Sequence, residues 1–296
     1  MGDGGPPAPP SPAPLLFALL APAGLATVAP ALAAASPADP GPALQPPLAL
    51  LQPWLVAFGL NAALIAVAQR LPLLTPAGWV HAAALGTVLW GCLGPRGWLA
   101  VVAYLLLGSL VTRLGFRSKQ ARGLAEARGG RRGPENVWGS AATGALLAMA
   151  ISLWPQHRAL LLLGFAASFA AKLADTFGSE IGKRWGRHTW LITSLRPVPP
   201  GTEGAISLEG TAASFGGGLL MALLALALGL LPFGAASGWA TLLVAAVALL
   251  ATLLESCIGA TLQGRLPWLS NELVNALQTA IAAVLAIALW SWLAIA

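Results

Sequence analysis

Acidic, basic and hydroxyl side chains are concentrated in residues 172–183, at the end of a long apolar segment. The stretch reads KLADTFGSEIGK and contains two acids, two lysines and two hydroxyls. A charged residue at the centre of a bilayer costs ~2.5–3.5 kcal/mol on insertion scales, so acids at the end of a membrane helix require an explanation. Carboxylates, lysines and hydroxyls grouped with glycines indicate phosphate and metal chemistry more than helix packing.

Helical spacing places these polar residues on one face of a helix. The stripe consists of Lys172, Asp175, Thr176, Ser179 and Lys183. Residues at this spacing lie together along one side of an α-helix. Two later apolar segments carry similar stripes, made of Glu255, Gly259 and Gln263 and of Asn271, Asn275 and Gln278. We expect the three stripes to line one cavity, although hydroxyl and amide side chains in membranes also bond simply to neighbouring helices.

The composition is that of an integral membrane protein. Of the 296 residues, 57% are hydrophobic and 9% are charged, against roughly 25% charged residues in a soluble domain. The pI near 10.4 does not indicate nucleic-acid binding, because the basic residues lie between apolar segments. The patterns GxxxxGK[ST], HExxH and CxxC are absent from the sequence, so it offers no standard soluble nucleotide-binding or zinc motif. Cys92 and Cys257 lie in apolar stretches and are interpreted as small buried residues.

The apolar segments predict an all-α, polytopic bundle of seven or eight transmembrane helices, forming a single membrane domain over residues 48–296. A spanning helix needs ~20 mostly apolar residues. The candidate segments are 48–69, 76–93, 97–114, 137–154, 159–178, 207–231, 239–262 and 271–296.

Residues 1–47 differ in kind from the rest of the chain. They hold 13 of the 24 prolines, a composition typical of a disordered tail. Within this tail, residues 15–35 are apolar enough to form a weakly inserted helix. They also resemble a targeting segment, because Ala31-Leu32-Ala33-Ala34 is similar to a cleavage site. A signal peptide normally begins with basic residues, and none precedes this stretch, so the three interpretations stay open.

The distribution of basic residues predicts the orientation. Alternating eight spans places fourteen of the sixteen Lys and Arg residues on one side and leaves only Arg96 and Arg158 on the other. By the positive-inside rule, the basic loops are expected to be cytoplasmic. The same topology brings four acids to that side, namely Asp175, Glu180, Glu209 and Glu255. Their convergence indicates a functional site.

The segment 196–211 has the character of a phosphate-binding loop. Prolines stiffen it, and glycines allow backbone amides to approach a ligand closely. It leads into a helix N-terminus, where free N–H groups and the helix dipole favour an anion. Gly201, Thr202, Gly204 and Thr211 are the candidate contacts. Ser207 is also an ordinary N-cap candidate, which needs no ligand.

Five runs in this sequence resemble the transmembrane protein 19 family, also described as domain of unknown function 92. They are RRGPENVWGS at 131–140, ADTFGSEIG at 174–182, PPGTEG at 199–204 with GT at 210–211, ES at 255–256 with GATLQ at 259–263, and NE at 271–272 with Asn275. The resemblance covers about residues 48–296. Glu203 stands where many members carry a shorter polar residue such as Asn.

One branch of that family is the phytyl-phosphate kinase of tocopherol and phylloquinone synthesis. The resemblance implies a membrane enzyme that converts a prenyl monophosphate into the diphosphate, with CTP as the expected nucleotide donor. Mg²⁺ is the expected cofactor, with Asp175 and Glu180 as first ligands and Glu209 and Glu255 as further catalytic acids. The expected partners are the lipid bilayer, an isoprenoid phosphate and a nucleotide, and the sequence indicates no protein partner and no nucleic acid.

The remaining candidate residues fall into two groups. The expected phosphate-binding residues are Lys172, Lys183, Gly201, Thr202, Gly204, Thr211, Arg131 and Arg132. The expected polar lining is Thr176, Ser179, Ser256, Gln263, Asn271 and Asn275. A transporter or flippase for a lipid or small anion is the alternative, and a non-catalytic scaffold is a third. Transporters often contain repeated halves and acids at the midplane, whereas this chain shows no convincing repeat and clusters its acids toward one side.

Overall fold

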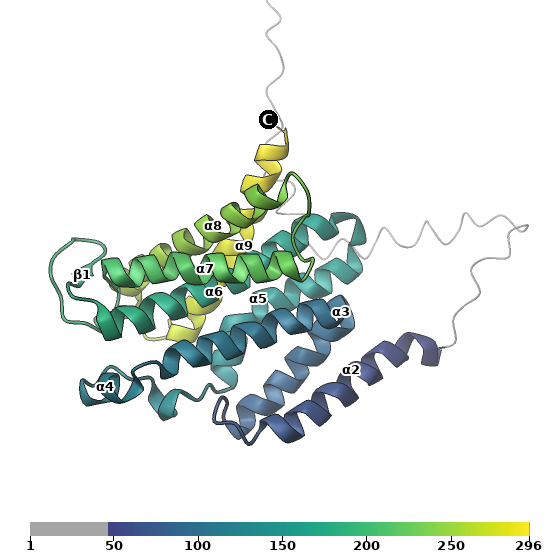
Figure 1. Ribbon diagram of the computed structural model, residues 1–296, viewed down its shortest axis with the longest axis horizontal. Coiled ribbons are helices and arrows are strands. Elements are labelled where there is room, and N and C mark those ends of the chain that lie inside the picture. The colour runs from purple at the N-terminus through teal and green to yellow at the C-terminus, as the bar shows by residue number, and fades with distance from the viewer. Residues whose placement is uncertain (1–46, 296) are drawn as a thin grey trace, which may run out of the picture. The chain divides into compact units, whose positions relative to one another are not determined.

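The structure is a computed structural model that describes residues 47–295, with side chains described for 51–293. Expectations for the Pro-rich tail, including the apolar stretch 15–35, lie outside these residues. The helices are α2 (Pro47–Ala68), α3 (Pro76–Arg113), α4 (Phe116–Ala121), α5 (Pro134–Leu153), α6 (Arg158–Trp185), α7 (Leu208–Ala227), α8 (Ser237–Ile258) and α9 (Asn271–Ile295). Within this described part, seven helices are long and apolar enough to cross a membrane. The prediction of an all-α, polytopic bundle is confirmed (Figure 1).

Helix α3 accounts for two of the predicted spans. A straight helix of its 38 residues would be about 57 Å long, far more than the ~30 Å hydrocarbon core of a bilayer. The chain instead turns at Gly94, where φ is 66° and ψ is −159°, a conformation that glycine adopts without steric cost. The two ends meet again, since Nη2 of Arg113 donates to the carbonyl of Pro72 at 2.5 Å. Helix α3 is therefore a hairpin of two arms.

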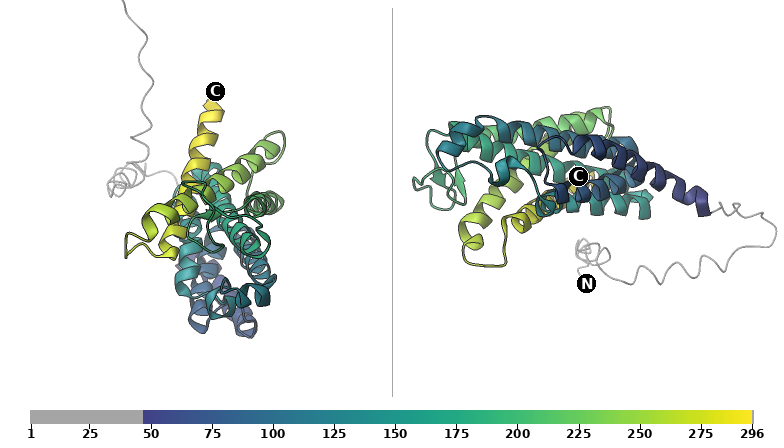
Figure 2. Two further views of the ribbon diagram at one scale, coloured as in Figure 1. Left: turned by 90° about the vertical axis from the view of Figure 1, so that its left-hand side faces the viewer. Right: turned by 90° about the horizontal axis from the view of Figure 1, so that it is seen from below.

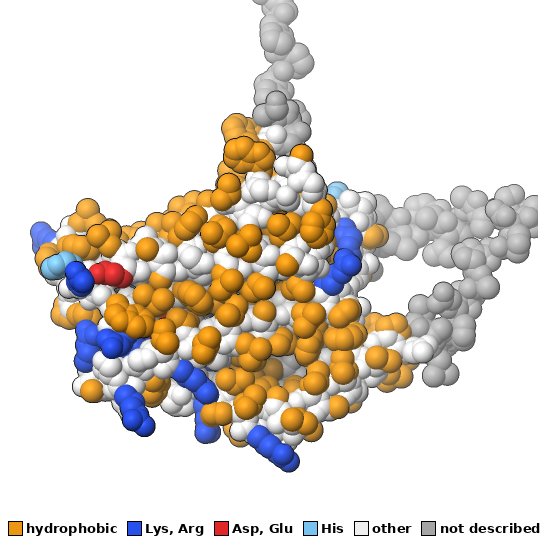
Figure 3. Space-filling view, viewed as in Figure 1, with side chains coloured by type: hydrophobic (Ala, Val, Ile, Leu, Met, Phe, Trp, Pro, Cys, Tyr) orange, Lys and Arg blue, Asp and Glu red, His pale blue; other side chains and the backbone are white. Residues whose placement is uncertain are grey.

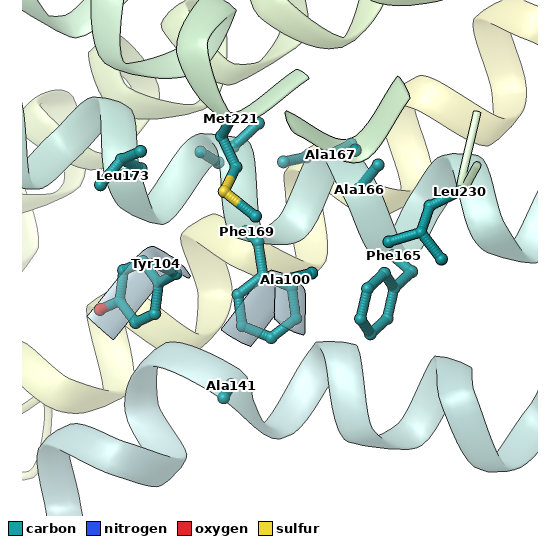
Figure 4. Packing of buried hydrophobic residues seen from close by; sticks show 14 of the residues in the cluster. Ala100, Tyr104, Ala141, Phe165, Ala166, Ala167, Phe169, Leu173, Met221 and Leu230 are labelled. Carbon is teal, nitrogen blue, oxygen red and sulfur yellow. The ribbon is translucent and has the colours of Figure 1, made fainter. Parts of the chain in front are cut away.

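Helix α6 lies at the centre of the bundle. It contacts α3, α5, α7, α8 and α9, and most of its residues between Leu161 and Thr176 are buried. Figure 4 shows Phe169 of α6 between Tyr104 of α3 and Phe165 of α6. The ring centroids of Tyr104 and Phe169 are 5.8 Å apart, and those of Phe165 and Phe169 are 5.0 Å apart. The polar stripe predicted on this segment therefore projects from the most enclosed helix.

Two helix boundaries differ from the sequence prediction. Helix α6 continues to Trp185 and does not end at Gly178. Gly178 is an interior position where α6 approaches α7 closely, since a Cβ there would lie 3.1 Å from the carbonyl oxygen of Gly210. Helix α7 ends at Ala227 rather than 231, because Gly229 adopts a positive φ of 69° and such a glycine terminates helices.

A short antiparallel pair of strands joins α6 to α7. Strand β1 (Trp190–Leu191) pairs with β2 (Ala205–Ile206), with Trp190 opposite Ile206. The pair and α4 lie at one end of the bundle (Figures 1 and 2). Figure 3 shows that Lys and Arg side chains gather toward this end, whereas the middle of the same face is hydrophobic. This pattern is that of a membrane-spanning bundle with one strongly basic end.

Small residues allow α6 and α7 to pack closely. A Cβ at Gly217 would lie 2.9 Å from Cβ of Phe177 and 3.0 Å from the carbonyl oxygen of Leu173. The neighbouring Gly216 has no atom within 4 Å of its would-be Cβ. Gly217 therefore lies in the helix interface, and Gly216 faces away from it.

These two glycines provide a matched test of the interface. We expect Gly217→Ala to lower the free energy of unfolding by about 1–3 kcal/mol, because overpacking forces the helices apart. Gly216→Ala adds the same methyl group in open space, where it gains up to ~1 kcal/mol of helix propensity. Thermal unfolding of both variants in detergent measures the difference. Equal stability of the two variants would contradict the close contact.

Candidate active site

A polar cavity of about 450 Å³ lies at the end of the bundle that carries β1 and α4. We call it the polar cavity. Its acidic lining consists of Glu126, Asp175, Glu180, Glu203, Glu255 and Glu272. Its basic lining consists of Lys172, Lys183, Arg128, Arg131 and Arg132. So many charges converging in an apolar bundle match the expectation for a ligand site rather than for packing.

Lys172 links two of the predicted polar stripes. Its Nζ donates to Oδ2 of Asp175 at 2.5 Å and to Oδ1 of Asn275 at 2.8 Å. Lys172 and Asn275 are buried, and they come from α6 and α9, more than 100 positions apart in sequence. Thr176, Ser179, Ser256 and Asn271 also line the cavity. The ammonium group is thus held in a fixed position at the wall of the cavity.

Glu180 forms a buried ion pair that the sequence did not reveal. Nζ of Lys119, in α4, contacts Oε2 of Glu180, and both side chains are almost fully enclosed. The same ammonium donates to the carbonyl of Thr112 at 2.8 Å. In the sequence, Lys119 is one cation of a basic loop, and nothing in its neighbourhood distinguishes it. One oxygen of Glu180 is therefore already occupied by a protein cation.

Lys183 and Glu126 form a second pair at the rim. Nζ of Lys183 donates to Oε1 of Glu126 at 3.1 Å. Burial raises the pKa of Glu126, but the charge and hydrogen bond of Lys183 outweigh it, so the pKa lies below its ordinary value. Glu126 therefore remains a carboxylate at neutral pH and balances one cation of the cavity.

The loop before α5 supplies the arginines of the cavity. Arg132 lies over the ring of Tyr104, with its guanidinium carbon 5.2 Å from the ring centroid, and Nη1 donates to the Tyr104 hydroxyl at 3.0 Å. Asn136 accepts from Arg128 at 2.9 Å and donates to Oε1 of Glu272, in α9, at 3.2 Å. Arg131 is exposed at the cavity wall. Tyr104, Arg128 and Asn136 were not among the predicted site residues.

The predicted phosphate-binding loop reaches the cavity as expected. Gly201, Thr202, Gly204 and Thr211 all line it. Gly204 has a φ of 75°, and a Cβ there would lie 2.6 Å from the carbonyl oxygen of Ser256, so the loop packs directly on α8. Ser207 caps α7, since its Oγ accepts from the backbone N–H of Gly210 at 3.1 Å. The start of α7 lies at the wall of the polar cavity, where Gly210 and Thr211 contribute to the lining.

Two predicted site residues lie outside the polar cavity, and the structure corrects both placements. Oε1 of Glu209 accepts from the backbone N–H of Arg187 at 3.3 Å, so this carboxylate binds the backbone just after the end of α6. Gln263 lies in a π-helical turn, Gly259–Gln263, that follows α8. A π-turn changes the number of residues per turn, so the α-helical spacing from Glu255 no longer predicts the direction of Gln263.

The metal-binding capacity of the polar cavity is limited. Over residues 47–295, no group of three or more His, Cys, Asp or Glu side chains is placed to hold a metal ion. Mg²⁺ usually binds through one or two carboxylates plus substrate phosphates and water, and this chemistry fits the residues present. Asp175 and Glu255 line the same cavity. Lys172 engages one oxygen of Asp175, and Lys119 engages one oxygen of Glu180.

Comparison with known proteins identifies the family of this chain. The model of the family described as "Integral membrane protein DUF92" matches residues 59–283. An uncharacterized membrane protein of Synechocystis is 53% identical over 238 residues, covering 79% of this chain and 90% of the relative. Protein VTE6, chloroplastic, of Arabidopsis thaliana is 40% identical over 224 residues, covering 72% of this chain and 64% of the relative. No solved structure matches the chain. The chain therefore belongs to the DUF92 family of integral membrane proteins.

Proposed function

We propose that this protein is a membrane prenyl-phosphate kinase. In this proposal, it transfers a phosphoryl group from a nucleotide, with CTP as the expected donor, to phytyl or a related isoprenoid monophosphate. The observation that carries the proposal is the convergence of acids, lysines and arginines from three helices and two loops in one cavity. The likeness of its motifs to the phytyl-phosphate kinase branch of the family supports the prenyl substrate.

Phosphoryl transfer suits this set of residues. The reaction breaks the bond between the terminal phosphorus of the nucleotide and its bridging oxygen, and it forms a bond from that phosphorus to an oxygen of the acceptor phosphate. The acceptor is already an anion, so no strong general base is required. The protein must instead position two anions and neutralise their charge. Lys172, Lys183 and Arg132 provide fixed cations for this task.

Asp175 and Glu255 would hold Mg²⁺ together with the substrate phosphates. Mg²⁺ held by these carboxylates would supply positive charge that neutralises the phosphoryl group during transfer. Gly201, Gly204 and Thr211 would offer backbone and hydroxyl donors to one phosphate group. Asn275 holds the ammonium of Lys172 in place through its hydrogen bond of 2.8 Å. By the positive-inside rule, we further propose that this end of the bundle faces the cytoplasm.

A reconstituted assay tests the proposal. Purified protein with phytyl monophosphate, CTP and Mg²⁺ should form the diphosphate, and a chelator should abolish the product. Thermal stabilisation by a panel of nucleotides would identify the donor, since a ligand at a hundred times its Kd adds about 2.7 kcal/mol of stability. Accumulation of a lipid phosphate or small anion in vesicles, with no nucleotide consumed, would instead assign the protein to the transporter class.

A further inference from the structure

A second cavity of about 630 Å³ lies between α2, the two arms of α3 and α5. We call it the apolar cavity. Its lining is mainly aliphatic and aromatic, with Ile65, Trp79, Leu85, Val101 and Val137 among the contributing residues. Its volume falls within the ~300–1,000 Å³ of small-molecule sites. An apolar space of this size suits a hydrocarbon chain.

The apolar cavity adjoins the polar cavity. Four residues line both, namely Tyr104, Arg132, Asn136 and Ser140. The two spaces therefore meet at the start of α5, where α3 passes beside it. A ligand seated across this junction would have an apolar part on one side and a polar, anionic part on the other.

Arg132 is held firmly at this junction. Its backbone N–H donates to the carbonyl of Leu73 at 3.1 Å, and its carbonyl accepts from the N–H of Thr75 at 3.0 Å. Its guanidinium group is fixed against Tyr104 by a hydrogen bond of 3.0 Å. A planar guanidinium matches the geometry of a phosphate group and binds it through paired N–H donors. The junction thus carries a positioned phosphate-binding group at the mouth of an apolar space.

Helix α2 closes the side of the apolar cavity through one polar contact with α3. Nε1 of Trp98 donates to Oδ1 of Asn61 at 2.8 Å. Gly86 makes room for this contact, since a Cβ there would lie 2.2 Å from the same oxygen. Nδ2 of Asn61 is satisfied by the carbonyl of Ala57 at 2.7 Å. Since both ends of the amide are satisfied within the protein, Asn61 does not require a polar ligand.

We propose that the apolar cavity binds the isoprenoid chain of the substrate, with Arg132 contacting its phosphate at the junction. This inference rests on the proposed function, because the occupant is the prenyl monophosphate of that reaction. The inference also identifies the helices that would select the length of the isoprenoid chain. These are the two arms of α3 and the face of α5 that lines the apolar cavity.

A pair of tryptophan substitutions on α3 tests the placement. Ala82 lines the apolar cavity, whereas Ala84 is exposed and does not line it. We expect Ala82→Trp to lower kcat/KM for phytyl monophosphate by about tenfold or more, and to lower that for the short dimethylallyl monophosphate much less. Ala84→Trp should affect neither. An equal loss of both activities in Ala82→Trp, or an equal loss in the two variants, would overturn the proposal.

Photocrosslinking gives a readout that does not depend on catalysis. A prenyl monophosphate with a diazirine at the far end of its chain should label peptides of α2, α3 or α5 in the wild-type protein. Excess phytyl monophosphate should displace the label, and Ala82→Trp should reduce it. Labelling of α7 or α9 instead, or displacement by phosphatidic acid but not by phytyl monophosphate, would overturn the assignment. Specific labelling without diphosphate formation would support the binding site for the isoprenoid chain and would contradict only the proposed kinase activity.

Discussion

Replacing Asp175 by Asn is expected to lower the rate of diphosphate formation by at least about a hundredfold, the scale seen when one electrostatic contact to a transition state is removed. The substitution keeps the size of the side chain but removes a carboxylate that lines the polar cavity. It also weakens the hold on the Lys172 ammonium, which Asp175 contacts at 2.5 Å. Initial rates with saturating Mg²⁺ and nucleotide, for protein of wild-type thermal stability, measure the effect.

Glu209→Gln is the matched control for that experiment. Both substitutions turn a carboxylate into an amide, and sequence reasoning assigned both residues to the catalytic set. Glu209 lies outside the polar cavity, and its Oε1 only accepts from the N–H of Arg187, a role that an amide oxygen can fill. We expect this variant to keep nearly full activity. Equal losses in the two variants would mean that the polar cavity does not define the reacting centre.

The helix periodicity and the charge distribution predict most of this architecture. The stripe that begins at Lys172 and the stripe that contains Asn275 were assigned to one cavity from their spacing alone, and the two side chains are in contact. Such predictions succeed because a membrane restricts the chain to helices whose polar faces must meet other polar groups. The same restriction explains why the spans could be recognised from hydropathy.

The sequence pattern does not predict the local backbone geometry at helix ends. The direction of Gln263 depends on a π-turn, which leaves no evident signal in the sequence. The direction of Glu209 depends on how α7 begins against α6, where Gly178 and Gly210 come close together. Most predicted residues near helix ends, such as Thr211 and Ser256, still line the polar cavity. The prediction failed for Glu209 and Gln263, whose placement depends on local backbone geometry.

The sequence also does not predict which side chains of the basic loops are buried. Lys119 resembles its basic neighbours in the sequence, yet its side chain is fully enclosed, whereas Arg131 is exposed. The difference arises from tertiary packing of α4 beneath the end of α6, over a separation of 61 residues. Single-sequence reasoning assigns all of these cations to topology, because the positive-inside rule counts charges without regard to their contacts.

Lys119→Met is expected to lower the free energy of unfolding by about 3–5 kcal/mol, the usual cost of removing one partner of a buried ion pair. The substitution leaves the carboxylate of Glu180 enclosed without its cation, since that side chain is only 2% exposed. It also leaves the carbonyl of Thr112 without its donor. Thermal unfolding in detergent, together with size-exclusion behaviour, measures the loss.

The double variant Lys119→Met, Glu180→Met separates the ion pair from simple packing. Replacing both members of a buried pair by apolar groups is often neutral or stabilising, so the double variant should recover much of the stability that the single variant loses. Activity should not recover with it, because Glu180 lines the polar cavity and the methionine supplies no charge there. A double variant as unstable as Lys119→Met would show that α4 docks by shape rather than by charge. Recovery of stability without activity would show that the instability of Lys119→Met comes from the unpaired carboxylate, and that the polar cavity requires the acid at position 180.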